Sequence, residues 1–136
     1  MPTIYLSPST QEFNPYVGGG NEEYYMNLLA DAMEPYLTAS GIQFVRNTPD
    51  MNAASSIAAS NRGNYDFHLA LHSNATGLEN STVRGAEFYY YPTSVNGKRF
   101  ADIAARNFQL IYPLPNMVKT VPTTSLGEVR RVKAPG

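Results

Sequence analysis

Apolar positions along the chain recur first at the spacing of a strand and then at the spacing of a helix. The β-branched and aromatic residues at 3–7, TIYLS, predict a first strand that ends at Pro8 and leads into a loop rich in proline and glycine. From Glu22 the apolar spacing changes to three and four residues, which predicts a helix with Asn21 as its N-cap. Its apolar stripe consists of Tyr25, Leu28, Leu29, Ala32, Met33, Tyr36 and Leu37.

The rest of the chain continues to alternate between strand-like and helix-like patterns. We expect a strand at 41–47, a helix within 49–64 capped by Asp50, strands at Phe67–His72 and at 85–92, and a helix from about Ser94 to Tyr112. This order predicts an α/β fold in which residues 1–136 form a single domain. A mostly parallel, twisted sheet would carry helices on both faces.

Composition and charge narrow the range of partners. The 136 residues carry 10 basic and 11 acidic side chains, so net charge offers no attraction to nucleic acid or to an anionic membrane surface. No apolar run approaches the ~18 residues of a membrane span, and the N-terminus lacks the features of a signal peptide. The glycines at 18–20 lack the Lys-Ser/Thr of a phosphate-binding loop, so they are interpreted as flexible backbone. Without cysteine, any metal must be bound by histidine, carboxylate and water.

Candidate metal ligands gather where a parallel sheet presents its ligand-binding edge. Glu12 follows the first strand, Glu22 and Glu23 open the first helix, and His72 closes the third strand. The carboxyl ends of parallel strands meet at one crevice, so these side chains would suit a divalent ion, with zinc the leading candidate. Acidic residues in a first helical turn are also favoured by the helix dipole alone, which leaves a purely structural role for both helix glutamates open.

The two histidines of the third strand have different expected roles. His68 and His72 are four residues apart on the strand, a separation of ~13 Å, so no more than one of them is a ligand of a given ion. His72 stands at the strand end, where the crevice is. His68 stands at the beginning and is expected to be packed or hydrogen-bonded below the sheet.

Several segments in order resemble one family of cell-wall hydrolases. They are IYLSPS, GGGNEEYYMNLLADAM, GIQFVRNTPD, SNRGNYDFHLALHSNA and GAEFYYYP. This chain resembles the zinc-dependent N-acetylmuramoyl-L-alanine amidases of type 3, bacterial and phage enzymes with a phosphorylase/hydrolase-like α/β fold. Asp66, His72 and Asn74 fall on the family's pattern around its metal-binding histidine. Glu23 stands at the family's spacing before Asn27, whereas Glu22 misses that spacing by one residue.

The resemblance implies a cofactor, a substrate and residue roles. It implies that zinc is held by His72 and Glu23, and that the ion polarises the amide carbonyl and activates a water molecule. The implied partner is peptidoglycan, cut between N-acetylmuramic acid and L-alanine. Asn74 and Arg131 are candidate substrate contacts, with a solvated strand face as the alternative for Arg131. Tyrosines such as Tyr16, Tyr24 and Tyr25 could stack on sugars, but their spacing favours packing.

Two features depart from the family pattern. The family's first histidine ligand is absent from SPSTQE at 7–12, where Thr10 takes its place. Glu12 could replace it as a carboxylate ligand, or it could be a substrate contact or a solvated side chain. The family's catalytic glutamate lies on a strand after an Ala-Pro turn, a position beyond Gly136, so we expect a C-terminally incomplete domain that lacks the last strand and helix. The nearest upstream carboxylate, Glu128, is expected to be a surface strand residue.

Three functions remain open at this point. The favoured one is an amidase domain with weak or no activity as the chain stands. A non-catalytic peptidoglycan-binding module of the same fold is the alternative. An unrelated α/β hydrolase or nucleotide-binding domain ranks last, because its sequence motifs are absent.

Overall fold

The computed structural model describes residues 1–77 and 81–136. Its helices and strands in chain order are β1 (Thr3–Pro8), α1 (Glu22–Ala39), β2 (Gln43–Arg46), α2 (Ala53–Arg62), β3 (Phe67–Leu71), β4 (Ala86–Tyr90), α3 (Val95–Gln109), a 3₁₀ turn (Pro115–Met117), β5 (Val118–Pro122) and α4 (Gly127–Arg130). The predicted α/β fold with a mostly parallel sheet flanked by helices is confirmed.

The central sheet is parallel and has β1 in its middle. Its order is β2-β1-β3, and Tyr5 lies opposite Val45 on one side and His68 on the other. Residues 4–9 of β1 and just beyond it are all buried, as expected for a central strand covered on both faces. The carboxyl ends of the three strands point to the same edge of the sheet.

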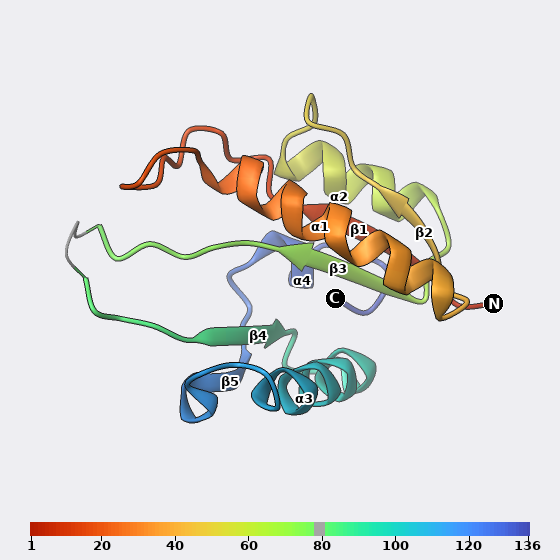
Figure 1. The fold of residues 1–136 in the computed structure, drawn as a ribbon. Coiled ribbons are helices and arrows are strands. Elements are labelled where there is room, and N and C mark those ends of the chain that lie inside the picture. Colours follow the sequence, from red (N-terminus) through yellow and green to blue (C-terminus); the bar gives the residue numbers. More distant parts are fainter. Residues whose placement is uncertain (78–80) are drawn as a thin grey trace.

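Helices cover both faces of this sheet (Figure 1). Arg46 of β2 donates to Asp31 Oδ1 of α1 at 2.6 Å, so α1 covers the face to which Arg46 points. Ser7 of β1 points to the opposite face, where its Oγ lies 2.9 Å from Ser56 Oγ of α2. The sheet is therefore sandwiched between α1 and α2, with its strand ends open toward the loops.

A second parallel pair of strands, β4 and β5, lies below the central sheet in Figure 1. Helix α3 packs on this pair, and the rings of Phe88 and Phe108 lie 5.7 Å apart. The chain then returns to the central sheet. There α4 lies beside α2, and Pro135 O accepts a hydrogen bond of 2.8 Å from the backbone N–H of His68. This return brings Glu128 of α4 back to the first half of the chain.

Of the two predicted N-caps, the one for α1 is confirmed and the one for α2 is wrong. Asn21 accepts a hydrogen bond from the N–H of Tyr24 at 2.8 Å, as predicted for the start of α1. The cap of α2 is Asn52 instead of Asp50, because Asn52 and Ser55 form a reciprocal capping box. Asp50 is instead hydrogen-bonded to the hydroxyl of Thr48.

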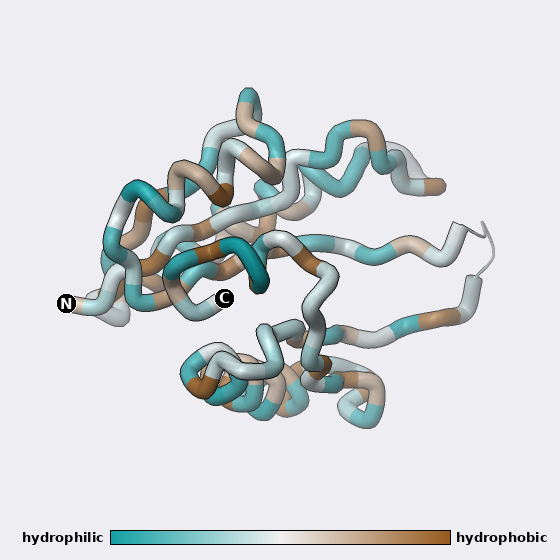
Figure 2. The backbone as a smooth tube through the Cα atoms, turned by 180° about the vertical axis from the view of Figure 1, so that it is seen from behind, coloured by the Kyte–Doolittle hydropathy of each residue, from teal (hydrophilic) through white to brown (hydrophobic). Residues whose placement is uncertain are grey.

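Much of the apolar stripe predicted for α1 faces solvent, although Met33 and Leu37 are half-buried. Only Glu22 and Ala30 of this helix are buried, whereas Leu28, Leu29 and Tyr36 are 45%, 45% and 77% exposed. Figure 2 shows that hydrophobic and hydrophilic segments are interspersed along the described part of the chain. Within the described residues, none of the helices combines the length and apolar character needed to cross a membrane.

Candidate functional site

Three side chains from distant parts of the chain meet at the carboxyl end of β3. His72 directly follows this strand, and its Nδ1 lies 2.8 Å from Glu22 Oε1 at the start of α1. Its Nε2 lies 2.6 Å from Glu128 Oε2 on α4. The imidazole is therefore held between two carboxylates that approach it from different elements. We call Glu22, His72 and Glu128 the His72 cluster.

Glu22 is fixed from several sides. Its side chain is buried, and its carboxylate accepts hydrogen bonds from Asn14 Nδ2 at 3.0 Å and from the N–H of Ser73 at 3.3 Å. Burial alone would raise the pKa of Glu22, but the hydrogen bonds from Asn14, His72, Ser9 and Ser73 together lower it. Glu22 is therefore an anion that points at His72.

Glu128 is the second anion of the cluster. Its Oε1 accepts from Ser7 Oγ at 2.5 Å and from His68 Nε2 at 3.1 Å, while Oε2 faces His72. Burial would raise the pKa of Glu128, but hydrogen bonds from His68, His72 and Ser7 lower it to about 2. One carboxylate thus joins the two histidines of the third strand.

His68 lies beneath the His72 cluster. It is 1% exposed, its ring stacks on Tyr5 at 5.4 Å, and its Nδ1 lies 2.9 Å from Ser60 Oγ. Because a carboxylate can only accept, Nε2 of His68 carries the proton shared with Glu128. The prediction that His68 is packed and hydrogen-bonded is confirmed.

His72 itself is an accessible group whose two carboxylate partners favour its charged form. Burial would lower its pKa, but the hydrogen bonds and negative charges of Glu128 and Glu22 raise it above its ordinary value. In the imidazolium form each ring nitrogen donates to one carboxylate. Since 34% of the side chain is exposed, a molecule at this edge of the sheet can reach the ring. The arrangement can hold a proton at a defined point and release it to a neighbour.

The structure selects a different glutamate from the one chosen by the resemblance. Glu22 contacts His72, whereas Glu23 lies beside Glu12. Successive helical residues point about 100° apart, so only one of the two can face the strand end. Burial, with the hydrogen bond and charge of Glu12, raises the pKa of Glu23. Glu12 and Glu23 form a separate carboxylate pair near the His72 cluster, and their metal-binding roles stay predictions.

The other predicted site residues lie around this edge or away from it. Asn74 is exposed and hydrogen-bonds to Tyr89 of β4. Asp66 lies at the opposite end of β3, where its carboxylate accepts from the N–H of Thr3 at 2.8 Å. Arg131 is exposed just after α4, and its carbonyl accepts from Asn61 Nδ2 at 2.8 Å. The structure therefore leaves the substrate roles of Asn74 and Arg131 as predictions.

The prediction for Glu128 was wrong. It was expected on a surface strand, but it belongs to the short helix α4 and its side chain is 12% exposed. The signal in the sequence lies in the residues around Glu128: Ser7, Ser56 and Ser60 are polar residues at inward positions of β1 and α2. These serines and Asn47 are buried and hydrogen-bonded. Because buried polar groups need hydrogen-bond partners, a further polar side chain was to be expected among them.

The donor set at this site fits a zinc ion only in part. A zinc centre in an enzyme commonly takes three protein ligands. Glu22 and His72 bring an oxygen and a nitrogen donor together, but both ring nitrogens of His72 face carboxylates. Across residues 1–77 and 81–136, no group of three or more histidine, aspartate or glutamate side chains is placed to hold a metal ion. The described arrangement is therefore a hydrogen-bonded ion cluster and does not present a complete zinc ligand set.

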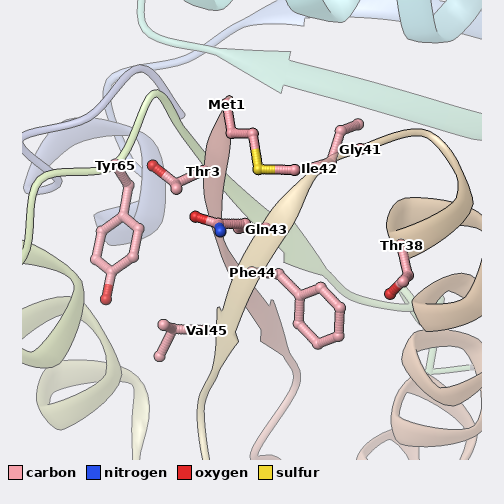
Figure 3. Close-up of a pocket in the computed structure, with 9 residues that line it drawn as sticks. All are labelled: Met1, Thr3, Thr38, Gly41, Ile42, Gln43, Phe44, Val45 and Tyr65. Carbon is pink, nitrogen blue, oxygen red and sulfur yellow. The ribbon is translucent and has the colours of Figure 1, made fainter.

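A hollow of about 460 Å³ lies along β2 (Figure 3), and none of its lining residues belongs to the His72 cluster. Its lining runs along β2 and the turn before it and includes Met1, Thr3 and Tyr65. These residues stand at the amino ends of the strands, whereas ligands of open α/β sheets bind at the carboxyl ends. The lining contains no histidine and no carboxylate. We therefore assign the candidate site to the His72 cluster.

Comparison with solved structures identifies the fold. No family model matches the chain, and no curated protein matches it. Among solved structures, the N-acetylmuramoyl-L-alanine amidase AmiC2 of Nostoc punctiforme superposes with a TM-score of 0.82 at 18% identity, over 98% of this chain and 75% of that one. The chain has an amidase-type fold.

Two clostridial structures show the same amidase-type fold. The CwlD amidase from Clostridioides difficile, solved in complex with the GerS lipoprotein, has a TM-score of 0.80 at 13% identity, over 99% of this chain and 79% of that one. The N-acetylmuramoyl-L-alanine amidase from Clostridium difficile 630 has a TM-score of 0.79 at 15% identity, over 98% of this chain and 75% of that one. The resemblance seen in the sequence is thus confirmed at the level of the fold.

Proposed function

We propose that this chain is a peptidoglycan amidase domain that hydrolyses the bond between N-acetylmuramic acid and L-alanine. The observation that carries the proposal is the His72 cluster at the carboxyl end of β3, within a fold similar to that of three amidases. The same edge of an open α/β sheet is where ligands bind. The structural neighbours are named as N-acetylmuramoyl-L-alanine amidases or as an amidase, which supports this substrate class.

The roles follow from the charges of the cluster. Amide hydrolysis adds water across the C–N bond, and the leaving amine needs a proton. Without a metal, His72 is placed to supply that proton, because Glu22 and Glu128 raise its pKa and part of its ring is exposed, and the proton lost by the attacking water would restore it. With zinc bound, His72 would serve as a ligand instead. Glu22 orients the ring through Nδ1, and Glu128 does so through Nε2. Glu128, with a pKa of about 2, is suited to hold His72 in place but is a weak base.

Zinc is the cofactor proposed for this site. Its proposed ligands are Glu22 and His72, with Glu12 and Glu23 as further carboxylates near this edge. Binding would require His72 to lose a proton and one carboxylate contact, so the affinity for zinc should rise with pH. Zinc content per chain, measured after loading at pH 6 and pH 8, tests this expectation. No zinc at either pH would remove the cofactor from the proposal.

The decisive experiment measures new amino groups released from purified peptidoglycan. The amidase proposal expects new L-alanine amino termini with the wild-type chain and a loss of about 10²-fold or more with His72→Ala. Tyr36→Ala is the matched control, because Tyr36 lies at the far end of α1 and is 77% exposed. Equal release by the wild type and His72→Ala, or none by the wild type after zinc loading, would contradict the amidase proposal.

A binding module of the same fold is the second candidate. It is favoured by one observation, namely that Glu22 and Glu128 already occupy both nitrogens of His72. A module of this kind would sediment with insoluble peptidoglycan and release no amino groups. Sedimentation and amino-group release, measured in the same sample, separate the two functions.

A further inference from the structure

Three tyrosine rings form a compact group beside the His72 cluster. The rings of Tyr16 and Tyr25 are stacked, with centroids 4.8 Å apart and an angle of 5° between their planes. Tyr24 meets Tyr25 edge-on at 5.2 Å. Tyr16 comes from the loop after β1, and the other two come from the first turn of α1. We call Tyr16, Tyr24 and Tyr25 the tyrosine platform.

The glycine run of the preceding loop allows this stacking. Gly20 has φ +75°, and a Cβ at this residue would lie 2.7 Å from Cε2 of Tyr25. The loop is closed by a hydrogen bond of 2.9 Å from the N–H of Tyr16 to Gly20 O, and by a bridge between Pro15 and Asn21. The loop is therefore a built element in which glycine makes room for an aromatic ring.

The tyrosine platform is joined directly to the candidate site. The hydroxyl of Tyr16 is hydrogen-bonded to Ser73 Oγ, and Ser73 is the residue after His72. The N–H of Ser73 donates to Glu22, which also contacts His72. A molecule that lies on the tyrosine platform would therefore extend toward the imidazole of His72.

The platform faces solvent and is not part of the core. Tyr24 is 56% exposed and Tyr25 is 39% exposed, and the neighbouring Phe13 and Val17 are exposed as well. The packing role favoured by the sequence therefore does not account for Tyr24 and Tyr25. Exposed aromatic side chains gathered beside a functional edge indicate a binding surface.

The chemistry of the surroundings selects the kind of ligand. The Glu12–Glu23 pair adds negative charge at the start of α1, which disfavours the phosphates of nucleic acids and anionic lipids. Carboxylates accept hydrogen bonds from hydroxyl and acetamido groups, while tyrosine rings offer an apolar face with a polar edge. A pyranose ring has both features, because one of its faces carries C–H groups and its rim carries hydroxyls.

We propose that Tyr16, Tyr24 and Tyr25 form a carbohydrate subsite that stacks on an N-acetylated sugar ring of a glycan strand. This inference rests on the proposed function, because it places the glycan part of the substrate next to the His72 cluster. Tyr24 and Tyr25 supply the exposed rings, and Tyr16 anchors them to Ser73. The amide bond attached to that sugar would then lie toward His72.

The test is a titration of the isotope-labelled chain with the tetrasaccharide of N-acetylglucosamine, followed by NMR. We expect shifts that saturate and are centred on residues 13–25, and an affinity weakened about five- to tenfold in Tyr24→Ala. Tyr24→Phe keeps the ring and should bind within about twofold of the wild type. Tyr36→Ala is the matched control on the same helix and should leave the affinity unchanged.

The outcomes separate this inference from the proposed function. The subsite is wrong if the wild type shows no saturable shifts, if the shifts centre elsewhere, or if Tyr36→Ala weakens binding as much as Tyr24→Ala. A folded Tyr24→Ala chain with wild-type affinity, judged by circular dichroism, also overturns it. Binding without release of amino groups from peptidoglycan would support the subsite while the amidase proposal fails. Release of amino groups without binding of the tetrasaccharide would do the reverse.

Discussion

Replacing Glu128 by glutamine removes the negative charge shared by the two histidines while keeping the side-chain shape. The pKa of this carboxyl falls from 4.5 to about 2 in the folded chain, which corresponds to about 3 kcal/mol of folding free energy at neutral pH. The side chain is only 12% exposed, so solvent screens this interaction little. We therefore expect Glu128→Gln to lower the free energy of unfolding by about 3 kcal/mol at pH 7.

The lowered pKa of Glu128 also predicts how this loss of stability changes with pH. The folded chain binds the proton of Glu128 more weakly than the unfolded chain does. The stabilisation is therefore fully present above pH 4.5 and is lost as the pH falls toward 2. At pH 3 the difference between wild type and Glu128→Gln should shrink to about 1 kcal/mol.

Urea unfolding followed by circular dichroism at both pH values measures this difference. Glu87→Gln is the matched control, because Glu87 is exposed on β4 and should cost less than about 0.5 kcal/mol. A loss in Glu128→Gln no larger than in Glu87→Gln, or one that does not shrink at pH 3, would refute the reasoning.

Three further predictions concern the start of α1. Asn21→Ala removes the acceptor for a helix-terminal N–H and should cost about 1 kcal/mol in urea unfolding, whereas an unchanged midpoint would contradict the capping role. Gly20→Ala places a Cβ against Tyr25 at a positive φ and should cost about 1–2 kcal/mol; a variant as stable as the wild type would show that this loop is not tightly built. Burial, together with the hydrogen bond and charge of Glu12, raises the pKa of Glu23. Because Glu12→Gln removes the repulsion between the two carboxylates, the thermal midpoint at pH 7 should stay equal or rise, and a clear fall would refute that account.

Much of the first half of the fold was predictable from local patterns. The strand at residues 3–7, the Asn21 cap and the strand ending near His72 are confirmed because each depends on neighbours in sequence. β5 and α4 were missed. β5 is a short strand after a proline-rich turn, and α4 has only four residues, so neither contains enough periodic positions to be recognised.

The location of the candidate site was predictable from the sequence, but the set of residues that form it was not. His72 at a strand end and an acidic first helical turn were visible in the sequence, and both lie at the expected edge. The choice between Glu22 and Glu23 depends on the rotation of α1 against the sheet. That rotation also explains why Leu28, Leu29 and Tyr36 are exposed although their spacing predicts a buried stripe.

The sequence by itself determined the order of elements from β1 to α3, the α/β class and the presence of one histidine at a ligand-binding edge. These features follow from residue periodicity, capping and strand order, which act over short stretches of chain. Only the tertiary structure decided which carboxylates hold His72, because Glu128 is separated from it by 56 positions and approaches through α4. The tertiary structure also decided the pKa values of these side chains, because desolvation and hydrogen bonding at the site depend on every segment that packs there.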